Sequence, residues 1–130
     1  MMAYRDEAHL YACLRELFAQ IESDLPQAMD SMLKAKLCIR FDCSEPNAEL
    51  TINARKRPLQ IDYGRSAHRP DLDIDMTGDA LHQILLGNLS LTKAVGSKKV
   101  KPKGPVWKVM ALADLFTHAQ KIYPDIFAAQ

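Results

Sequence analysis

The sequence predicts an α+β domain in which helices cover one face of a β-sheet. Apolar residues repeat at helical spacing before residue 37 and after residue 77, and between these points they alternate with polar residues. The chain has 130 residues, of which 48% are hydrophobic and 25% charged, as is typical of a packed globular protein. We therefore expect one domain over residues 1–130 with a substantial apolar core.

An amphipathic helix is expected over residues 4–23. Its apolar residues share one face, and the charged residues fall largely elsewhere. The apolar positions are Leu10, Leu14, Leu17, Phe18 and Ile21. Pro26 then restarts the chain, and the apolar spacing from Met29 to Leu33 favours a short second helix with its apolar side inward.

Four strands are expected next, at about 37–43, 50–55, 59–63 and 71–77, because the apolar period changes to two. Each strand has an apolar side and a polar side, so one face of the sheet should be apolar and the other solvated. Short polar segments rich in Pro, Asn and Gly separate the strands. We therefore expect neighbouring strands to pair as an antiparallel meander.

Helices are expected again after the fourth strand. Thr77 and Ser90 are suited to cap two short helices. A weak strand at 100–104 should lie at a sheet edge or a bulge, because it contains a proline. A last helix should run over 105–123, where Pro124 interrupts it. Its broad apolar face is suited to lie across the apolar side of the sheet.

The charge balance excludes a global field that would attract nucleic acid. Lys and Arg number 17 against 16 Asp and Glu, which gives a formal net charge of +1. The exception to this balance is a segment that ends at Lys108 and contains several lysines but no acidic residue. It includes Lys93, Lys98, Lys99, Lys101 and Lys103. A solvated face is the simpler interpretation, and transient contact with a membrane surface is the alternative. With Trp107 as the run's one aromatic residue, no nucleic-acid partner is expected.

The most concentrated carboxylates lie on the fourth strand. They are Asp71, Asp73 and Asp75, with Asp62 nearby. A carboxylate pair for acid–base chemistry or a Ca²⁺ site is the functional interpretation. Because residues two apart on a strand share a face, and because Arg40 and Arg55 occupy the polar sides of other strands, we favour a solvated polar face.

The histidines and cysteines form no recognisable ligand set. His9 and Cys13 stand four apart on the first helix, but no second pair completes a tetrahedral metal site. His82 and His118 are expected on the polar sides of helices. The 3 cysteines lack metal spacing, and no apolar leader is present, which predicts reduced thiols in a cytoplasmic protein. We expect no catalytic residue, no metal and no cofactor.

The order of these segments resembles the sterol carrier protein type 2 family of non-specific lipid-transfer proteins. The resemblance spans about 25–116, and its main segments are LCIRF at 37–41, LDIDMTGD at 72–79, GNLSLTKA at 87–94 and VKPKG at 100–104. It implies a five-stranded, mixed but mainly antiparallel sheet with helices covering one face. It also implies a hydrophobic tunnel for a fatty acid, acyl-CoA, sterol or other lipid, and no enzymatic chemistry.

We therefore expect a non-enzymatic protein that binds or transfers a hydrophobic ligand. The residues expected to face the ligand follow from strand alternation and helical faces: Ile39, Phe41, Ile52, Ile61, Ile74, Met76, Leu85, Leu89, Met110 and Phe116. From the pattern alone, a filled core is the commoner outcome. The alternative function is an accessory module that contacts a protein partner in a lipid- or quinone-modifying enzyme complex.

Overall fold

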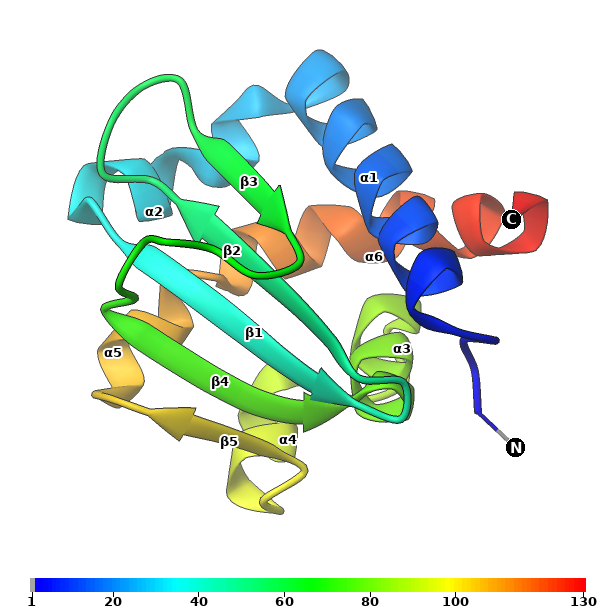
Figure 1. Ribbon diagram of the computed structural model, residues 1–130. Coiled ribbons are helices and arrows are strands. Elements are labelled where there is room, and N and C mark those ends of the chain that lie inside the picture. Colours follow the sequence, from blue (N-terminus) through cyan, green and yellow to red (C-terminus); the bar gives the residue numbers. More distant parts are fainter. Residues whose placement is uncertain (1) are drawn as a thin grey trace.

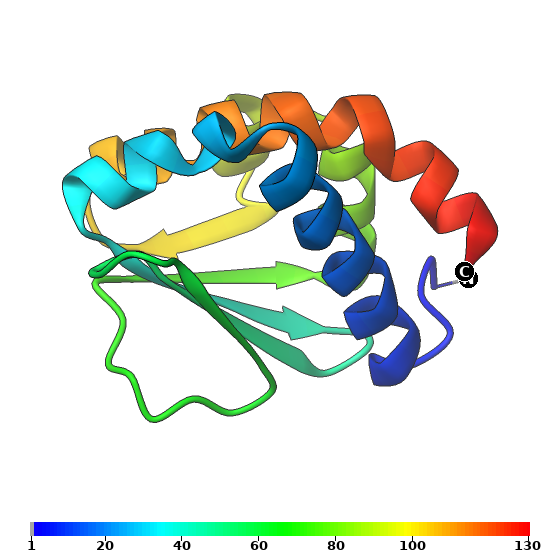
Figure 2. The ribbon, with the colours of Figure 1, turned by 90° about the horizontal axis from the view of Figure 1, so that it is seen from above.

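The chain forms two layers, a β-sheet and a set of helices on one of its faces (Figures 1 and 2). The computed structural model describes residues 2–130. The elements are α1 (Glu7–Asp24), the 3₁₀ helix η1 (Pro26–Met29), α2 (Asp30–Ala35), β1 (Cys38–Ser44), β2 (Ala48–Asn53), β3 (Gln60–Tyr63), β4 (Leu72–Thr77), α3 (Gly78–Leu86), α4 (Leu91–Gly96), β5 (Val100–Lys103), α5 (Val106–Met110) and α6 (Ala113–Ala129).

The sheet has five strands in the order β3-β2-β1-β4-β5. β1 pairs antiparallel with β2 and parallel with β4, while the β2–β3 and β4–β5 pairs are antiparallel. This confirms the α+β fold with a mixed, mainly antiparallel sheet. The prediction of an antiparallel meander is wrong at one junction, because the 64–71 loop returns the chain so that β4 runs beside β1, with Ile74 opposite Phe41.

Local signals set the helix starts as predicted. The hydroxyl of Thr77 accepts a hydrogen bond from the Ala80 N–H at 3.0 Å, and that of Ser90 accepts one from the Lys93 N–H at 3.1 Å. Both hydroxyls satisfy amide donors that would otherwise lack a partner in the first turn. The predicted caps of α3 and α4 are therefore confirmed.

The last helix differs from its prediction at both ends. Instead of one helix that stops before Pro124, the chain forms the short α5, turns at Ala111, and continues as α6 through Pro124. A proline removes one hydrogen bond from a helix interior. Tyr123 and Ile126, on either side of it, are buried, and their packing stabilises the helix on both sides of that lost bond.

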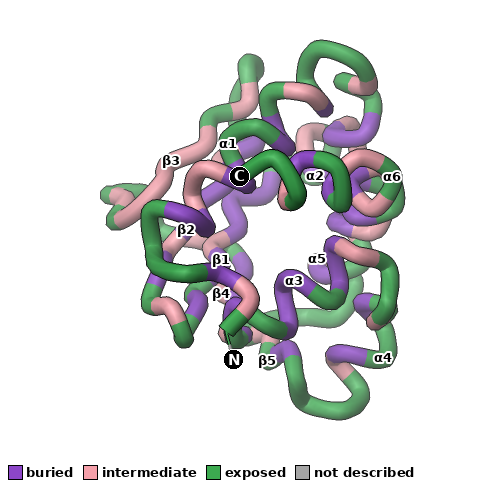
Figure 3. Tube along the Cα trace, turned by 90° about the vertical axis from the view of Figure 1, so that its right-hand side faces the viewer, coloured by how far each residue is buried: buried purple, intermediate pink, exposed green. Residues whose placement is uncertain are grey.

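Buried residues gather between the two layers, and exposed residues lie on the outside (Figure 3). The apolar sides of β1, β2 and β4 face the helices, with Ile39, Ile52 and Ile74 at 0% exposure. α1 and α6 pack against each other over this face. The apolar interior of the protein therefore lies between these helices and the sheet.

Candidate functional site

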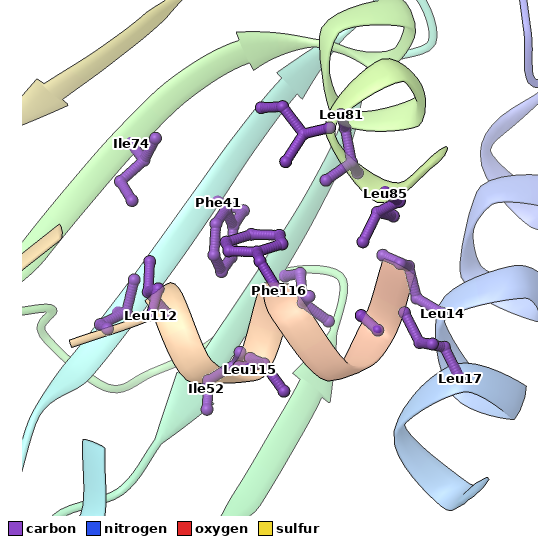
Figure 4. Close-up of a cluster of buried hydrophobic side chains, with 14 of the residues drawn as sticks. Leu14, Leu17, Phe41, Ile52, Ile74, Leu81, Leu85, Leu112, Leu115 and Phe116 are labelled. Carbon is purple, nitrogen blue, oxygen red and sulfur yellow. The ribbon is translucent and has the colours of Figure 1, made fainter. Parts of the chain in front are cut away.

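An apolar cavity lies between the helices and the sheet. Side chains from α1, α3 and α6 meet those of β1 and β2 around it, and Figure 4 shows Leu14, Leu85 and Phe116 converging from three helices. The lining consists of Leu10, Leu14, Leu17, Phe18, Phe41, Cys43, Ala48, Glu49, Leu50, Leu81, Leu85, Leu115, Phe116 and Ala119. Glu49 is the one charged residue of this lining, and its carboxylate lies 3.6 Å from Arg40.

The cavity is nearly filled by its own side chains. Its volume is about 20 Å³. For comparison, an engineered apolar cavity of roughly 150 Å³ is large enough to bind benzene. The structure therefore holds a small apolar cavity, whereas the resemblance implied a tunnel, and a hydrocarbon chain would fit only if the lining side chains separated.

Some of the residues that were predicted to face the ligand line the cavity. Phe41, Leu85 and Phe116 line it, and the rings of Phe41 and Phe116 meet edge to face with their centroids 6.3 Å apart. The other strand residues are buried in the same layer without lining the cavity: Ile39, Ile52, Ile74 and Met76.

Three of the assigned residues lie farther out. Ile61 is half-buried because β3 is an edge strand, and Leu89 is half-buried in the connection between α3 and α4. Met110 is 46% exposed. Its expected inward position assumed one continuous helix, but the chain turns between α5 and α6, which changes the direction that Met110 faces.

Sequence reasoning missed the contribution of the first helix to the cavity. Leu10, Leu14, Leu17 and Phe18 of α1 all line it. The apolar stripe of α1 was the available signal, and it correctly predicted a buried face. A stripe of this kind does not say which part of the interior it will cover.

A buried polar cluster joins the N-terminal segment to α3 and α6. The Tyr123 hydroxyl shares hydrogen bonds with the Tyr4 hydroxyl and with Nδ1 of His82, the latter at 2.8 Å. The expected position of His82 on a polar helix side is wrong, because α6 and Phe127 cover that side of α3. Burial lowers the pKa of His82 and raises the pKa of Tyr123.

The cysteines offer no reactive thiolate. Cys13, Cys38 and Cys43 are buried and unpaired. Burial raises the pKa of Cys13 to about 11 and that of Cys43 to about 12. A thiol needs its deprotonated form to act as a nucleophile or a metal ligand. His9, one turn from Cys13, is buried and accepts a hydrogen bond at Nδ1 from the Arg5 N–H at 3.1 Å.

The acidic strand faces basic residues, as its alternation predicted. Arg40 pairs with Asp73, and Arg55 lies 3.2 Å from Asp71. Lys103 of β5 lies 3.3 Å from Asp75. Carboxylate oxygens of Asp42, Asp73 and Asp75 lie within 4.8 Å of one another. Two of these three carboxylates are neutralised by the basic partners named above, which is typical of a solvated polar face.

The structure divides the lysine run between the two ends of the sheet. Val100 of β5 aligns with Met76 near the end of β4, and Lys103 aligns with Asp73 near its start. Lys98 and Lys99 precede β5, while Lys103 and Lys108 lie at and beyond its other end. Lys101 lies between them on β5, so these lysines are spread along the length of this edge strand.

A solvent-open groove adjoins the cavity near the turn between β1 and β2. The groove and the cavity share Cys43, Ala48 and Glu49 in their linings. The Tyr11 hydroxyl, on the groove side, accepts a hydrogen bond from the Glu49 N–H at 3.0 Å. This bond ties α1 to β2 at the boundary between the groove and the cavity.

Comparisons with known proteins agree with this architecture. The sequence matches the model of the SCP-2 sterol transfer family over residues 14–117. A search of curated protein sequences finds no match. In residues 2–130, no helix combines the length and apolar character needed to cross a membrane.

Several solved structures share the fold. The sterol carrier protein domain 2 of Helicoverpa armigera has a TM-score of 0.67 at 19% identity, over 89% of this chain and 90% of that one. Palmitated SCP2L2 from Aedes aegypti has a TM-score of 0.61 at 15% identity, over 81% and 91%. The ubiquinone synthesis protein UbiJ-SCP2 has a TM-score of 0.54 at 18% identity, over 72% and 77%.

Proposed function

Because the chain belongs to the SCP-2 sterol transfer family, we propose that it binds a hydrophobic ligand, without catalysis, in the cavity between α1, α3, α6 and the sheet. The observation that carries this proposal is a lining that is apolar apart from Glu49. Moving apolar surface from water into such a lining gains about 25 cal/mol per Å². The Aedes aegypti neighbour was solved in its palmitated form, which supports a lipid as the ligand.

The proposed ligand enters when the first helix moves away from the sheet. α1 supplies four of the lining residues, which are Leu10, Leu14, Leu17 and Phe18. Its polar contacts with the sheet are few: the Tyr11 hydroxyl bonds the Glu49 N–H, and the Arg15 guanidinium lies 4.7 Å from the centroid of the Tyr63 ring. Separating α1 from β2 breaks these contacts and widens the cavity.

Saturable uptake of a lipid by the delipidated protein tests the proposal. The protein is incubated with a fluorescent fatty acid and with a fluorescent sterol, and native mass spectrometry of the freshly purified protein looks for a retained lipid. We expect one ligand bound per chain with at least one probe. Absence of saturable uptake with both probes, together with no retained lipid, contradicts a carrier function.

A pair of leucine variants links uptake to the cavity. Leu85 lines the cavity and Leu112 is buried outside it, and both are almost inaccessible to solvent. Each Leu→Ala change should lower the free energy of unfolding by about 2–5 kcal/mol. Leu85→Ala should also change the affinity for the probe, whereas Leu112→Ala should leave it unaltered. An equal effect of both variants on affinity places the ligand elsewhere.

An accessory role in a lipid- or quinone-modifying complex is the second candidate function. The observation in its favour is the small cavity volume of about 20 Å³, and the UbiJ-SCP2 neighbour is named as a ubiquinone synthesis protein. A stable complex in pull-downs combined with no lipid uptake favours this role. For either role we propose a cytoplasmic location, in keeping with three unpaired cysteines.

A further inference from the structure

The short helix α5 exposes large apolar side chains that the core does not use. Val106, Trp107 and Met110 are 61%, 59% and 46% exposed. Apart from Met2, they are the exposed large apolar residues of the chain between residues 2 and 130. Their positions at i, i+1 and i+4 put them on one side of α5, while Val109 is buried on the other. Neither the cavity nor the groove beside Tyr11 includes them.

The same end of the sheet gathers basic residues from segments that are far apart in the sequence. β1 and β4 start there and β2 and β5 end there, because Cys38 aligns with Asn53 and Asp73 with Lys103. In Figure 1 this is the left-hand end, with α2 and α5. Among the described residues, the basic side chains there that form no ion pair are Lys34, Lys36, Lys56, Arg57, Arg69 and Lys108.

The acids at this end offset that charge only in part, and Glu22 and Asp30 share a surface pocket with Arg57. Asp71 lies at the start of β4, and Arg55 already pairs with it at 3.2 Å. Asp30 and Asp114 are the carboxylates of the nearby helix starts. At the opposite end, Glu45 lies in the turn between β1 and β2, and Asp42 and Glu49 lie on these strands beside it. Lys98 and Lys99 also lie at the opposite end, so the α5 end is distinguished by basic residues that share it with the exposed side chains of α5.

We propose that this basic end docks on an anionic phospholipid bilayer, with Val106, Trp107 and Met110 at the level of the headgroups. Trp is enriched at membrane interfaces, and dispersed basic residues are attracted by an anionic leaflet. The Lys108 ammonium lies 5.7 Å from the centroid of the Trp107 ring, so one short helix presents an apolar surface and a cation together. Proteins that bind single-stranded nucleic acid stack successive bases on several aromatic side chains, and this surface has only Trp107. A bilayer is therefore favoured over nucleic acid as the partner.

The inference goes beyond the proposed function because it concerns recruitment and not the path of the ligand. The groove beside Tyr11 lies near the β1–β2 turn, at the other end of the strands. Docking through α5 therefore leaves that groove free to meet solvent or a partner protein. Membrane docking and lipid uptake can accordingly succeed or fail independently.

The chain's single tryptophan makes the docking surface directly observable. The full-length protein is mixed with vesicles of phosphatidylcholine alone or of phosphatidylcholine with phosphatidylglycerol, and Trp107 emission and co-sedimentation are recorded. We expect a blue shift and co-sedimentation with the anionic vesicles, reversed by high salt. No binding to anionic vesicles, or binding without a change in Trp107 emission, overturns the proposal.

Two matched pairs of variants separate this surface from unspecific attraction. Lys34→Gln with Lys108→Gln should lower the vesicle partition coefficient by about twenty-five-fold, at roughly fivefold for each basic residue. Lys98→Gln with Lys99→Gln removes the same charge at the other end of β5 and should leave binding unaltered. Equal losses of vesicle binding in both double variants overturn the proposal. The proposal is also overturned if Lys34→Gln with Lys108→Gln weakens binding to DNA but not to vesicles.

The apolar part of the surface is tested with Trp107 retained. Val106→Ser with Met110→Ser changes two exposed side chains, so the fold should be preserved. This variant should co-sediment less and show a smaller blue shift than the unaltered protein, whereas its uptake of a fluorescent lipid should not change. Unaltered co-sedimentation of this variant overturns the assignment of α5 to the bilayer.

Discussion

The hydroxyls of Tyr4 and Tyr123 share a hydrogen bond inside the protein, which joins the segment before α1 to the middle of α6. Both side chains are at 0% exposure. The Tyr123 hydroxyl is also bonded to Nδ1 of His82, so the two ends of the chain are held against α3. This cluster stabilises the helical layer that covers the cavity, and it leads to the first two predictions.

Tyr123→Phe should lower the free energy of unfolding by about 1–3 kcal/mol, because it leaves the Tyr4 hydroxyl and Nδ1 of His82 buried without their partner. Urea unfolding followed by circular dichroism measures the change. Tyr63→Phe is the control, because the hydroxyl of the half-buried Tyr63 neither donates nor accepts a hydrogen bond within residues 2–130. Equal losses in the two variants contradict a specific role for the cluster.

The stability of the protein should fall as the pH drops below about 6.5, the ordinary pKa of histidine. Burial is the main cause of the lowered pKa of His82, with His9 adding to it and Asp79 opposing it. Burial and Arg5 likewise lower the pKa of His9, against Asp6. Because the pKa values of these histidines are lower in the folded state, the unfolded chain takes up protons first as the pH falls. Their contribution to the free energy of unfolding is therefore fully present above the unfolded pKa and is lost as the pH falls below it.

Urea unfolding at about pH 7.5 and about pH 5.5 measures this loss. In His82→Asn the side chain no longer titrates, so the difference in stability between the two pH values should become smaller than in the unaltered protein. The variant is expected to be less stable at both. A pH dependence that is unchanged in His82→Asn contradicts the contribution of this histidine.

Gly78→Ala should destabilise the protein by about 1–3 kcal/mol through steric overlap. A Cβ atom at Gly78 would lie 2.8 Å from the Glu45 carbonyl oxygen and 3.0 Å from Cδ of Pro46. Gly96 is the matched control, because a Cβ there meets no atom within 4 Å. Gly96→Ala at the end of α4 should be neutral or stabilise by up to about 1 kcal/mol. Urea midpoints of both variants decide whether α3 starts this close to the β1–β2 turn.

None of the thiols should react with a disulfide reagent at about pH 8 while the protein is folded. Burial raises the pKa of Cys13, Cys38 and Cys43, and for Cys43 it reaches about 12. In denaturant all 3 cysteines should react, because the reagent and water then reach them. Mass spectrometry of the labelled peptides identifies any cysteine that reacts. Rapid labelling at Cys43 in the native protein would show that the cavity beside it opens readily.

Much of the architecture follows from local pattern. The alternation in β1 placed Ile39 and Phe41 in the interior, and the hydroxyls of Thr77 and Ser90 begin α3 and α4 as expected. The opposition of Arg40 to the acidic strand was also predictable. Periodicity and capping depend on residues within a few positions of one another, so a linear sequence already contains them.

Long-range packing set the rest. The place of β4 beside β1, the burial of His82 and the outward direction of Met110 each depend on a segment distant in sequence. The same holds for an interior that its own side chains nearly fill. A local pattern shows which face of a helix or strand is apolar. It does not show which other element packs against that face or how much space remains between them, because these depend on contacts that form only when the whole chain folds.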